Sequence, residues 1–329
     1  MRFLLDDEQR QFARSLDAML SAAGTPAAVR AWAAGDTGPG RAVWKRLAGA
    51  GVFALAVPEE HGGLGPLPVE LAVAFVELGR HAVPGPLVET VAAAAFLDRL
   101  GDPAAAAARL PGLASGAAVA SFCVLSPTAP YALDADTSDR VLVVDGDTVR
   151  LAEATGPVQP SADPARRLAR PGGGPVLARG PRVTAAAAHA ADVAALLTAA
   201  QALGVGRTLL DRTVAYVRAR TQFGVPVGSF QAVQHRLADT LVALEFARPL
   251  VFAAALALAA GDPGSGREAA MAKVAAGEAA YAASRTALHL HGALGYTAEL
   301  DLSLWIRKAR ALRTAWGTPA ACRARVLDP

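Results

Sequence analysis

Arg220 is the side chain in this sequence best placed to bind an anionic ligand. It lies at the end of a long alanine-rich helical segment, since Gly224 can act as a left-handed cap and Pro226 cannot continue a helix. Its planar guanidinium carries five donors that can bind a phosphate or a carboxylate in a bidentate manner. Phe230 and Gln231 then open the next helical run. Spacing alone leaves two alternatives open, an anion site or a solvated arginine beside a turn.

A second group of candidate residues ends a later helical run, in the segment from His289 to Tyr296. Gly292 and Gly295 in this segment leave backbone groups open to close approach by a ligand. His289 and His291 are two residues apart and point to different sides of a helix, so they do not predict a metal site.

The two cysteines, Cys123 and Cys322, are far apart and have no ligand spacing, so we expect buried free thiols. No metal site is predicted anywhere in the chain.

Composition sets limits on the class of protein. A chain of 329 residues, of which 53% are apolar, is long enough for two or three domains and a large core. The formal net charge is only +3 and the arginines are interspersed with acids, which does not favour nucleic-acid binding. The acidic start does not resemble a signal peptide, and the apolar stretch 250–260 is too short to span a membrane. We therefore expect a cytoplasmic protein with neither nucleic acid nor membrane as a partner.

Residues 1–115 read as an N-terminal helical domain, with amphipathic helices expected at 4–20, 42–50 and 70–79. The glycine-rich stretch Gly62–Gly65 lacks the Gly-Lys-Ser/Thr ending of a phosphate-binding loop, so it predicts a connection with unusual backbone angles.

Residues 116–185 change to short β-like runs and predict a reduced β-domain. The strands are expected at 118–125, 140–144, 148–151 and 174–177, with Asp145-Gly146 as a hairpin signal. Residues 186–329 predict a bundle of four long antiparallel helices, at about 186–220, 231–260, 267–290 and 298–314. The expected fold is mainly α with a small β-domain.

The segment around Arg220 resembles the signature of the acyl-CoA dehydrogenase family. The matching residues are Arg220, Gln222, Phe223, Gly224, Pro226, Gly228, Phe230, Gln231 and Gln234. The N-terminal region is also similar to the family, at Val52–Ala56, Pro58–Glu60, Gly62–Gly65 and Glu77–Arg80. The resemblance covers most of the chain and implies the family's architecture, with a small β-domain between helical domains.

What the resemblance implies for these residues is a role in binding FAD. In the family the Arg-x-Gln-Phe segment holds the diphosphate and adenine end of a flavin that belongs to a neighbouring subunit. By this resemblance Arg220 pairs with the diphosphate, while Gln222, Phe223 and Gln231 line the adenine side. The family's Gln-x-x-Gly-Gly-x-Gly segment matches His289 to Gly295, which implies that His289 and Gly292 contact the same part of FAD. Here His289 replaces the Gln and Ala293 replaces the second Gly, which weakens this part of the match.

Two departures from the family concern the flavin ring and the catalytic base. The Thr-Glu-Pro-x-x-Gly-Ser turn reads Ser126-Pro-Thr-Ala-Pro130 here, and the later Thr-Ser or Thr-Asn-Gly element has no counterpart. Abstraction of the α-proton of a thioester needs a carboxylate, and Trp316 stands where many members carry it. The second family location, near Ala194-Ala195, also lacks an acid.

Two nearby residues do not replace the base. Gln201 has an amide that cannot accept a proton, and Asp192 is expected on the surface. No catalytic residue is therefore assigned.

The leading hypothesis is an acyl-CoA dehydrogenase-like subunit of lipid metabolism that supports α,β-desaturation of an acyl thioester, bound to CoA or to a carrier protein. It would share FAD across an interface with a second family subunit, or with itself as a dimer or tetramer, and FAD can be absent from the isolated chain. The base would come from the partner. Two alternatives remain: a flavin-free enzyme of the same fold that catalyses a non-redox step, and a non-catalytic scaffold subunit.

Overall fold

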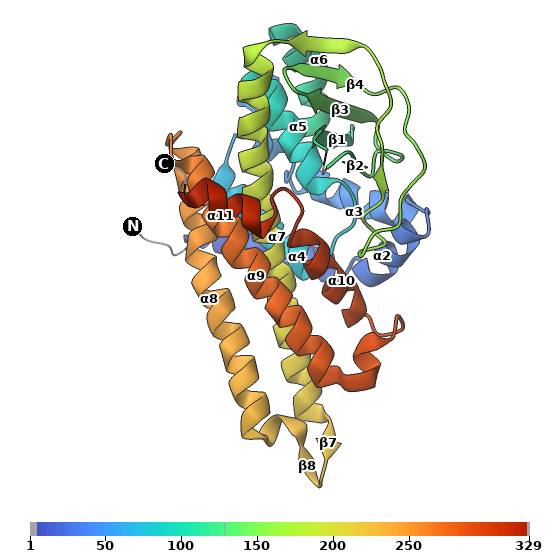
Figure 1. Cartoon of the computed structure of the whole chain (residues 1–329), viewed down its shortest axis with the longest axis vertical. Coiled ribbons are helices and arrows are strands. Elements are labelled where there is room, and N and C mark those ends of the chain that lie inside the picture. Colours follow the sequence, from blue (N-terminus) through green and yellow to red (C-terminus); the bar gives the residue numbers. More distant parts are fainter. Residues whose placement is uncertain (1–4, 128, 328–329) are drawn as a thin grey trace. The chain divides into compact units, whose positions relative to one another are not determined.

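The computed structural model describes residues 5–127 and 129–327 (Figure 1). The chain forms two compact units: one comprises Met1–Ala18, Ala72–Ala82 and Ala195–Pro329, and the other comprises Met19–Leu71 and Val83–Ala194. Three of the divisions fall within α1 (Asp7–Ser21), α4 (Pro68–Arg80) and α7 (Pro181–Ala219), and the other follows α4, between Ala82 and Val83. The expected fold class, mainly helical with a small β-domain and a C-terminal bundle, is confirmed.

The second unit holds the sheet and a group of helices. Its helices are α2 (Thr25–Ala33), α3 (Gly38–Gly49), α5 (Leu87–Leu100), α6 (Pro103–Ala114) and the short η1 (Ala54–Ala56) and η2 (Glu59–His61). Helix α5 is apolar all round and mostly buried, as expected of a central core helix. Its Thr90 hydroxyl donates to the carbonyl of Ala120 (2.7 Å), which satisfies both polar groups where the helix meets β1.

The main sheet has four strands in the order β1-β3-β4-β6. The strands are β1 (Ala120–Val124), β3 (Arg140–Asp145), β4 (Thr148–Leu151) and β6 (Val176–Arg179). Strand β1 pairs parallel to β3, and the other neighbours are antiparallel. Gly146 has φ 58° in the β3–β4 turn, which confirms the hairpin predicted at Asp145-Gly146.

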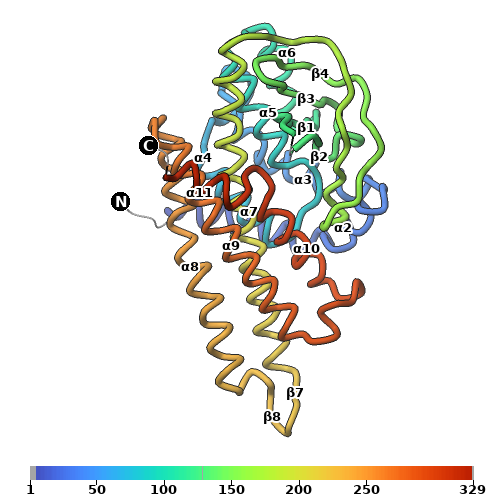
Figure 2. The backbone as a smooth tube through the Cα atoms, in the orientation of Figure 1, coloured from blue at the N-terminus to red at the C-terminus, as the bar shows by residue number. Residues whose placement is uncertain are grey.

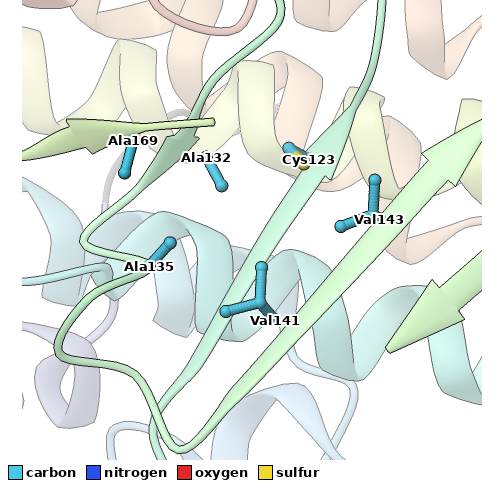
Figure 3. Packing of buried hydrophobic residues seen from close by; sticks show 6 residues of the cluster. All are labelled: Cys123, Ala132, Ala135, Val141, Val143 and Ala169. Atoms are coloured by element: carbon cyan, nitrogen blue, oxygen red, sulfur yellow. The ribbon is translucent and has the colours of Figure 1, made fainter. Parts of the chain in front are cut away.

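A separate two-stranded sheet pairs β2 (Ala132–Leu133) with β5 (Leu168–Ala169). Small buried side chains fill the space beside these strands (Figure 3): Cys123, Ala132, Ala135, Val141, Val143 and Ala169. Side chains of this size let β-strands and connecting segments approach closely, so a reduced domain can still bury a core.

The first unit contains the helical bundle. Its further helices are α8 (Gln231–Ala259), α9 (Ser265–His291), η4 (Gly292–Tyr296), α10 (Leu302–Leu312) and α11 (Pro319–Leu327). Helices α8 and α9 run antiparallel and side by side (Figure 2), joined by a turn at Gly261. The bundle helices lie close to their predicted positions, but α11 was not predicted.

Glycines permit close helix packing in the first unit. A Cβ on Gly79 of α4 would lie 2.0 Å from the carbonyl oxygen of Gln201 on α7. A Cβ on Gly204 would lie 1.9 Å from the carbonyl oxygen of Val76. Real carbon atoms cannot approach so closely, so any larger residue at either position must force the two helices apart.

The glycine-rich connection after η2 behaves as predicted. Gly62 has φ 78°, and a Cβ on Gly63 would lie 1.8 Å from the carbonyl oxygen of Val57. This stretch therefore needs glycine for backbone geometry and close packing.

Two helices, α7 and α8, are long and apolar enough to cross a membrane by length and composition alone, although we expected no such stretch. The apolar window of α7 is 83% buried, as in the core helix of a globular fold, whereas that of α8 is 33% buried. The exposed apolar face of α8 therefore needs a separate explanation.

Candidate functional site

The segment around Arg220 forms a hairpin that projects from the end of the bundle (Figure 1). Helix α7 ends at Ala219, close to the end expected at about residue 220. The chain then pairs β7 (Thr221–Gln222) with β8 (Val225–Pro226). Phe223 and Gly224 form the turn with φ 54° and 79°, the two positive values that a type I′ hairpin turn requires. The amide of Val227 donates to the carbonyl of Arg220 (2.8 Å) and closes the hairpin.

The predicted ligand-binding side chains of this segment are exposed. Phe223 is 92% exposed, and its ring lies edge-on to that of Phe230, with the ring centroids 6.3 Å apart. Arg220, Gln222 and Gln231 are also exposed. Within residues 5–127 and 129–327, the guanidinium of Arg220 makes no ion pair. These donors are therefore free to meet a ligand.

The end of α9 lies at the same end of the bundle. His291 is buried and stacks on Tyr216 of α7 (centroids 4.1 Å apart), and burial lowers its pKa. His289 is exposed, which confirms that the two histidines point to different sides of the helix. Gly292 is exposed with φ 58° and ψ −138°, a conformation that favours glycine. Ala293, which replaces the family's second Gly, is not among the residues with positive φ, so alanine fits this position without backbone strain.

The turn after α10 holds Trp316, which occupies the expected position of a base. Trp316 has φ 52° and is half-buried. The buried ammonium of Lys273 on α9 fixes this turn by donating to the carbonyls of Leu312 (2.9 Å), Arg313 (3.1 Å) and Gly317 (3.2 Å). The turn is thus well ordered by hydrogen bonds, yet residue 316 offers no carboxylate.

The alternative positions for a base lie on α7. Ala194, Ala195 and Gln201 are buried and have no acidic group. Asp192 is also buried, so the surface position expected for it is wrong. The part of α7 around Asp192 is mostly alanine, with valine and leucine, so its sequence shows no clear polar face that would tell which residues meet solvent.

His189, one turn before Asp192, has a lowered pKa because of burial and the charge of Arg99. Asp192 favours the charged form of this imidazole. Asp192 is therefore a buried carboxylate next to a half-buried histidine in the second unit.

A charged cluster that the sequence did not reveal joins α1 and α4 in the first unit. His81 Nε2 lies 2.8 Å from Asp17 Oδ1, and Arg80 Nη1 lies 3.1 Å from Glu77 Oε2 and 3.6 Å from Asp17 Oδ1. Burial, reinforced by the charge of Asp17, raises the pKa of Glu77 to about 7. Possible ligand atoms of Asp17, Glu77 and His81 all lie within 4.8 Å of one another. The guanidinium of Arg80 already supplies the cation here, so the cluster fits an internal ion-pair network.

Comparison with known proteins decides the family. The model for the acyl-CoA dehydrogenase N-terminal domain matches residues 6–117, and that for the C-terminal domain matches residues 184–328. Acyl-CoA dehydrogenase IpdE2 of Mycobacterium tuberculosis is 38% identical over 306 residues, which cover 92% of this chain and 91% of that protein. The chain belongs to the acyl-CoA dehydrogenase family. Its members are oxidoreductases that act on CH–CH groups.

Two further relatives match this chain over almost its full length. IpdE2 of Mycolicibacterium smegmatis is 33% identical over 321 residues, 96% of each chain. The solved structure of a Tcur3481–Tcur3483 steroid ACAD variant is 26% identical with a TM-score of 0.83, and the match covers 98% of this chain and 97% of that chain.

Members of the family bind FAD. The residues present fit one part of that cofactor: at one end of the bundle lie the exposed guanidinium of Arg220, which has no ion pair among the described residues, exposed amides, and an exposed aromatic side chain. The guanidinium of an arginine can form two parallel hydrogen bonds to a phosphate group, and an exposed aromatic ring can stack on adenine.

Proposed function

We propose that this chain is a subunit of an acyl-CoA dehydrogenase that binds the diphosphate and adenine end of FAD across a subunit interface. FAD would accept the hydride that leaves the β-carbon of an acyl thioester. This chain would bind the cofactor, while a partner subunit would supply the flavin-ring pocket and the carboxylate that removes the α-proton.

The observation that carries this proposal is the exposed hairpin. A single chain that bound the whole cofactor by itself would need these side chains to face a pocket of its own. Arg220, Gln222 and Phe223 instead project from the bundle end. A phosphate on Arg220 would replace water with a charge-assisted, bidentate contact, and a second subunit could complete the site around it.

The missing base supports the need for a partner. Acid–base catalysis requires a group within hydrogen-bond reach of the proton it removes. By the family resemblance the acid would lie at Trp316 or near Ala194 and Ala195, and none of these side chains can accept a proton. Asp192 lies two residues before Ala194 in the sequence, and its burial beside His189 makes it the residue to test as an alternative base.

The exposed face of α8 supports the interface. Its large apolar side chains include Val242 (51% exposed), Phe246 (74%) and Leu256 (38%), which recur at helical spacing. A stripe of this kind is costly in water and typical of a surface that another subunit covers. A partner seated on α8 would lie beside the hairpin that begins where α7 ends. The relative Tcur3481–Tcur3483 is named as a pair of chains, which favours a second family member as that partner.

The first experiment measures retained flavin. The chain is co-expressed with a longer family member that carries the catalytic Glu, and FAD is quantified after gel filtration. Arg220→Ala should lower the FAD content of the complex, whereas Arg236→Ala, an exposed arginine on α8, should not. Equal FAD content in both variants would mean that Arg220 does not bind the diphosphate.

A second experiment tests the base. The chain alone should not desaturate acyl-CoA in the presence of an electron acceptor, while the complex should. Activity of the isolated chain that Asp192→Asn abolishes would show that the chain carries its own base. The divisions at residues 115 and 185 and the cytoplasmic location also remain predictions.

A further inference from the structure

A groove in the first unit, away from the hairpin, has the composition of a ligand site. It has a volume of about 230 Å³ and lies among α1, α4, α7 and α8. One part of its wall is apolar, formed by Val73, Leu203 and Phe252, all of which are buried. Another part is charged, and the residues there include Arg207 and Arg248. Pockets with an apolar wall and a few converging polar groups are where small molecules bind.

The charged and apolar groups follow helical spacing. Leu203 and Arg207 are four residues apart on α7, and Arg248 and Phe252 are four residues apart on α8. Residues four apart lie on the same helix face, so α7 presents Leu203 and Arg207 to the groove, with Asp211 one turn further on, and α8 presents Arg248 and Phe252. This arrangement suits a molecule with an anionic group at one end and an apolar tail.

Three arginines line the groove, and two of them are already held by carboxylates. Arg80 is held by Glu77 (3.1 Å), and Arg207 is held by Glu245. Arg248 is half-buried, and no carboxylate in the described parts of the chain lies within 4.0 Å of its guanidinium. A partly desolvated cation without a counter-ion is unfavourable, and a bound carboxylate would relieve that cost.

Glu77 does not take the place of that counter-ion. Its carboxyl is already engaged by Arg80, and burial raises its pKa to about 7, so near neutral pH a large fraction is uncharged. Asp211 also lines the groove, but it is exposed to solvent and makes no ion pair with Arg248.

We propose that this groove binds a small carboxylate with a short apolar tail, through the guanidinium of Arg248 and the apolar wall around Phe252. The site is separate from the bundle end assigned to FAD, and the proposal does not depend on that assignment.

The test uses hexanoate as the probe and hexylammonium as its cationic counterpart of equal tail length. Calorimetric titration of the full chain should show saturable binding of hexanoate and none of hexylammonium. Arg248→Met keeps most of the apolar stem but removes the charge, and it should weaken hexanoate binding by at least about tenfold. Arg248→Lys should retain part of the affinity, and Arg236→Met should leave it unchanged.

Three results would overturn the proposal: no binding of hexanoate by the wild-type chain, equal binding of hexylammonium, or unchanged affinity in Arg248→Met. Circular dichroism spectra of each variant check that the fold is intact, so a loss of binding in a folded Arg248→Met chain counts as support.

Discussion

Substitution of Asp134 by Asn should make the protein more stable at alkaline pH. Asp134 is fully buried beside the β2–β5 strands, at the residue after Leu133, with φ 51°. Its Oδ1 accepts a hydrogen bond from Trp32 Nε1 (2.9 Å). Its Oδ2 is buried without a hydrogen-bond partner in the described parts of the chain. The carboxyl is therefore held in a place that disfavours its charged form.

The magnitude follows from proton linkage. Burial raises the pKa of Asp134 from 3.8 to about 7. The folded state then binds the proton more tightly than the unfolded state, so this stabilisation is complete below pH 3.8 and is lost as pH rises through about 7. About three pH units at about 1.4 kcal/mol each give a loss of about 4 kcal/mol between acidic and alkaline pH.

The asparagine variant removes this titration. Its amide oxygen can still accept from Trp32, and its amide nitrogen replaces the oxygen that has no partner. We expect Asp134→Asn to lie within about 1 kcal/mol of the wild type at pH 5. At pH 8.5 the variant should be more stable by up to about 4 kcal/mol.

The assay is urea denaturation followed by circular dichroism at both pH values, for the wild type and two variants. Asp136→Asn is the matched control, because Asp136 pairs with Arg167 (2.6 Å) nearby and is not fully buried. The control should show no gain on going to pH 8.5. If Asp134→Asn gains no stability relative to the wild type between pH 5 and pH 8.5, the carboxyl is not held neutral by burial and the reasoning is wrong.

Three further predictions concern the first unit and the packing of helices, each measured by urea denaturation. Gly204→Ala should cost about 3 kcal/mol or more, because its Cβ would lie 1.9 Å from the Val76 carbonyl oxygen. Gly49→Ala, whose Cβ meets no atom within 4 Å, should change stability by less than about 1 kcal/mol, and an equal loss in both would refute the packing argument. Lys273→Met should cost about 3 kcal/mol, since three carbonyls lose one buried donor group, and an unchanged midpoint would contradict this. Glu77→Gln should stabilise the protein at pH 8.5 but not at pH 4.5. Burial raises the pKa of Glu77 from 4.5 to about 7, so the stability that the protonated carboxyl contributes to the wild type is lost as pH rises across that interval. A gain of equal size at both pH values would exclude this cause.

The helical core and the β3–β4 hairpin could be predicted because they depend on local pattern. Asp145-Gly146 predicts its own turn, since Gly146 adopts a positive φ at no steric cost. The hairpin after Arg220 could not be predicted in this way, because Phe223 adopts φ 54°, which a bulky residue seldom does. Such a turn depends on the sequence around it and on packing at the bundle end.

One missed element did carry a local signal. Helix α11 begins at Pro319, and the Thr318 hydroxyl accepts a hydrogen bond from the amide of Ala321 (3.2 Å). A threonine cap followed by proline at the first helical position is a known start signal. The segment's mixture of alanine and arginine gave no apolar stripe to support it.

Contacts between charged side chains could be predicted only where the residues are close in sequence. Asp17 and His81 are 64 residues apart, and only the packing of α1 against α4 brings them together. The groove beside Arg248 likewise draws its walls from four helices. Contacts between residues so far apart in the sequence cannot be predicted from the spacing of residues along the chain.

The central claim is that this chain holds the adenine end of a flavin whose ring lies in another subunit. The most direct measurement is photo-crosslinking of the two-subunit complex with an FAD analogue that carries an azide at C8 of its adenine, followed by mass spectrometry of the labelled peptides. We predict that the adenine-linked label attaches to peptides of this chain that contain Phe223 or His289. Labelling confined to the partner, with none on these peptides, would contradict the account.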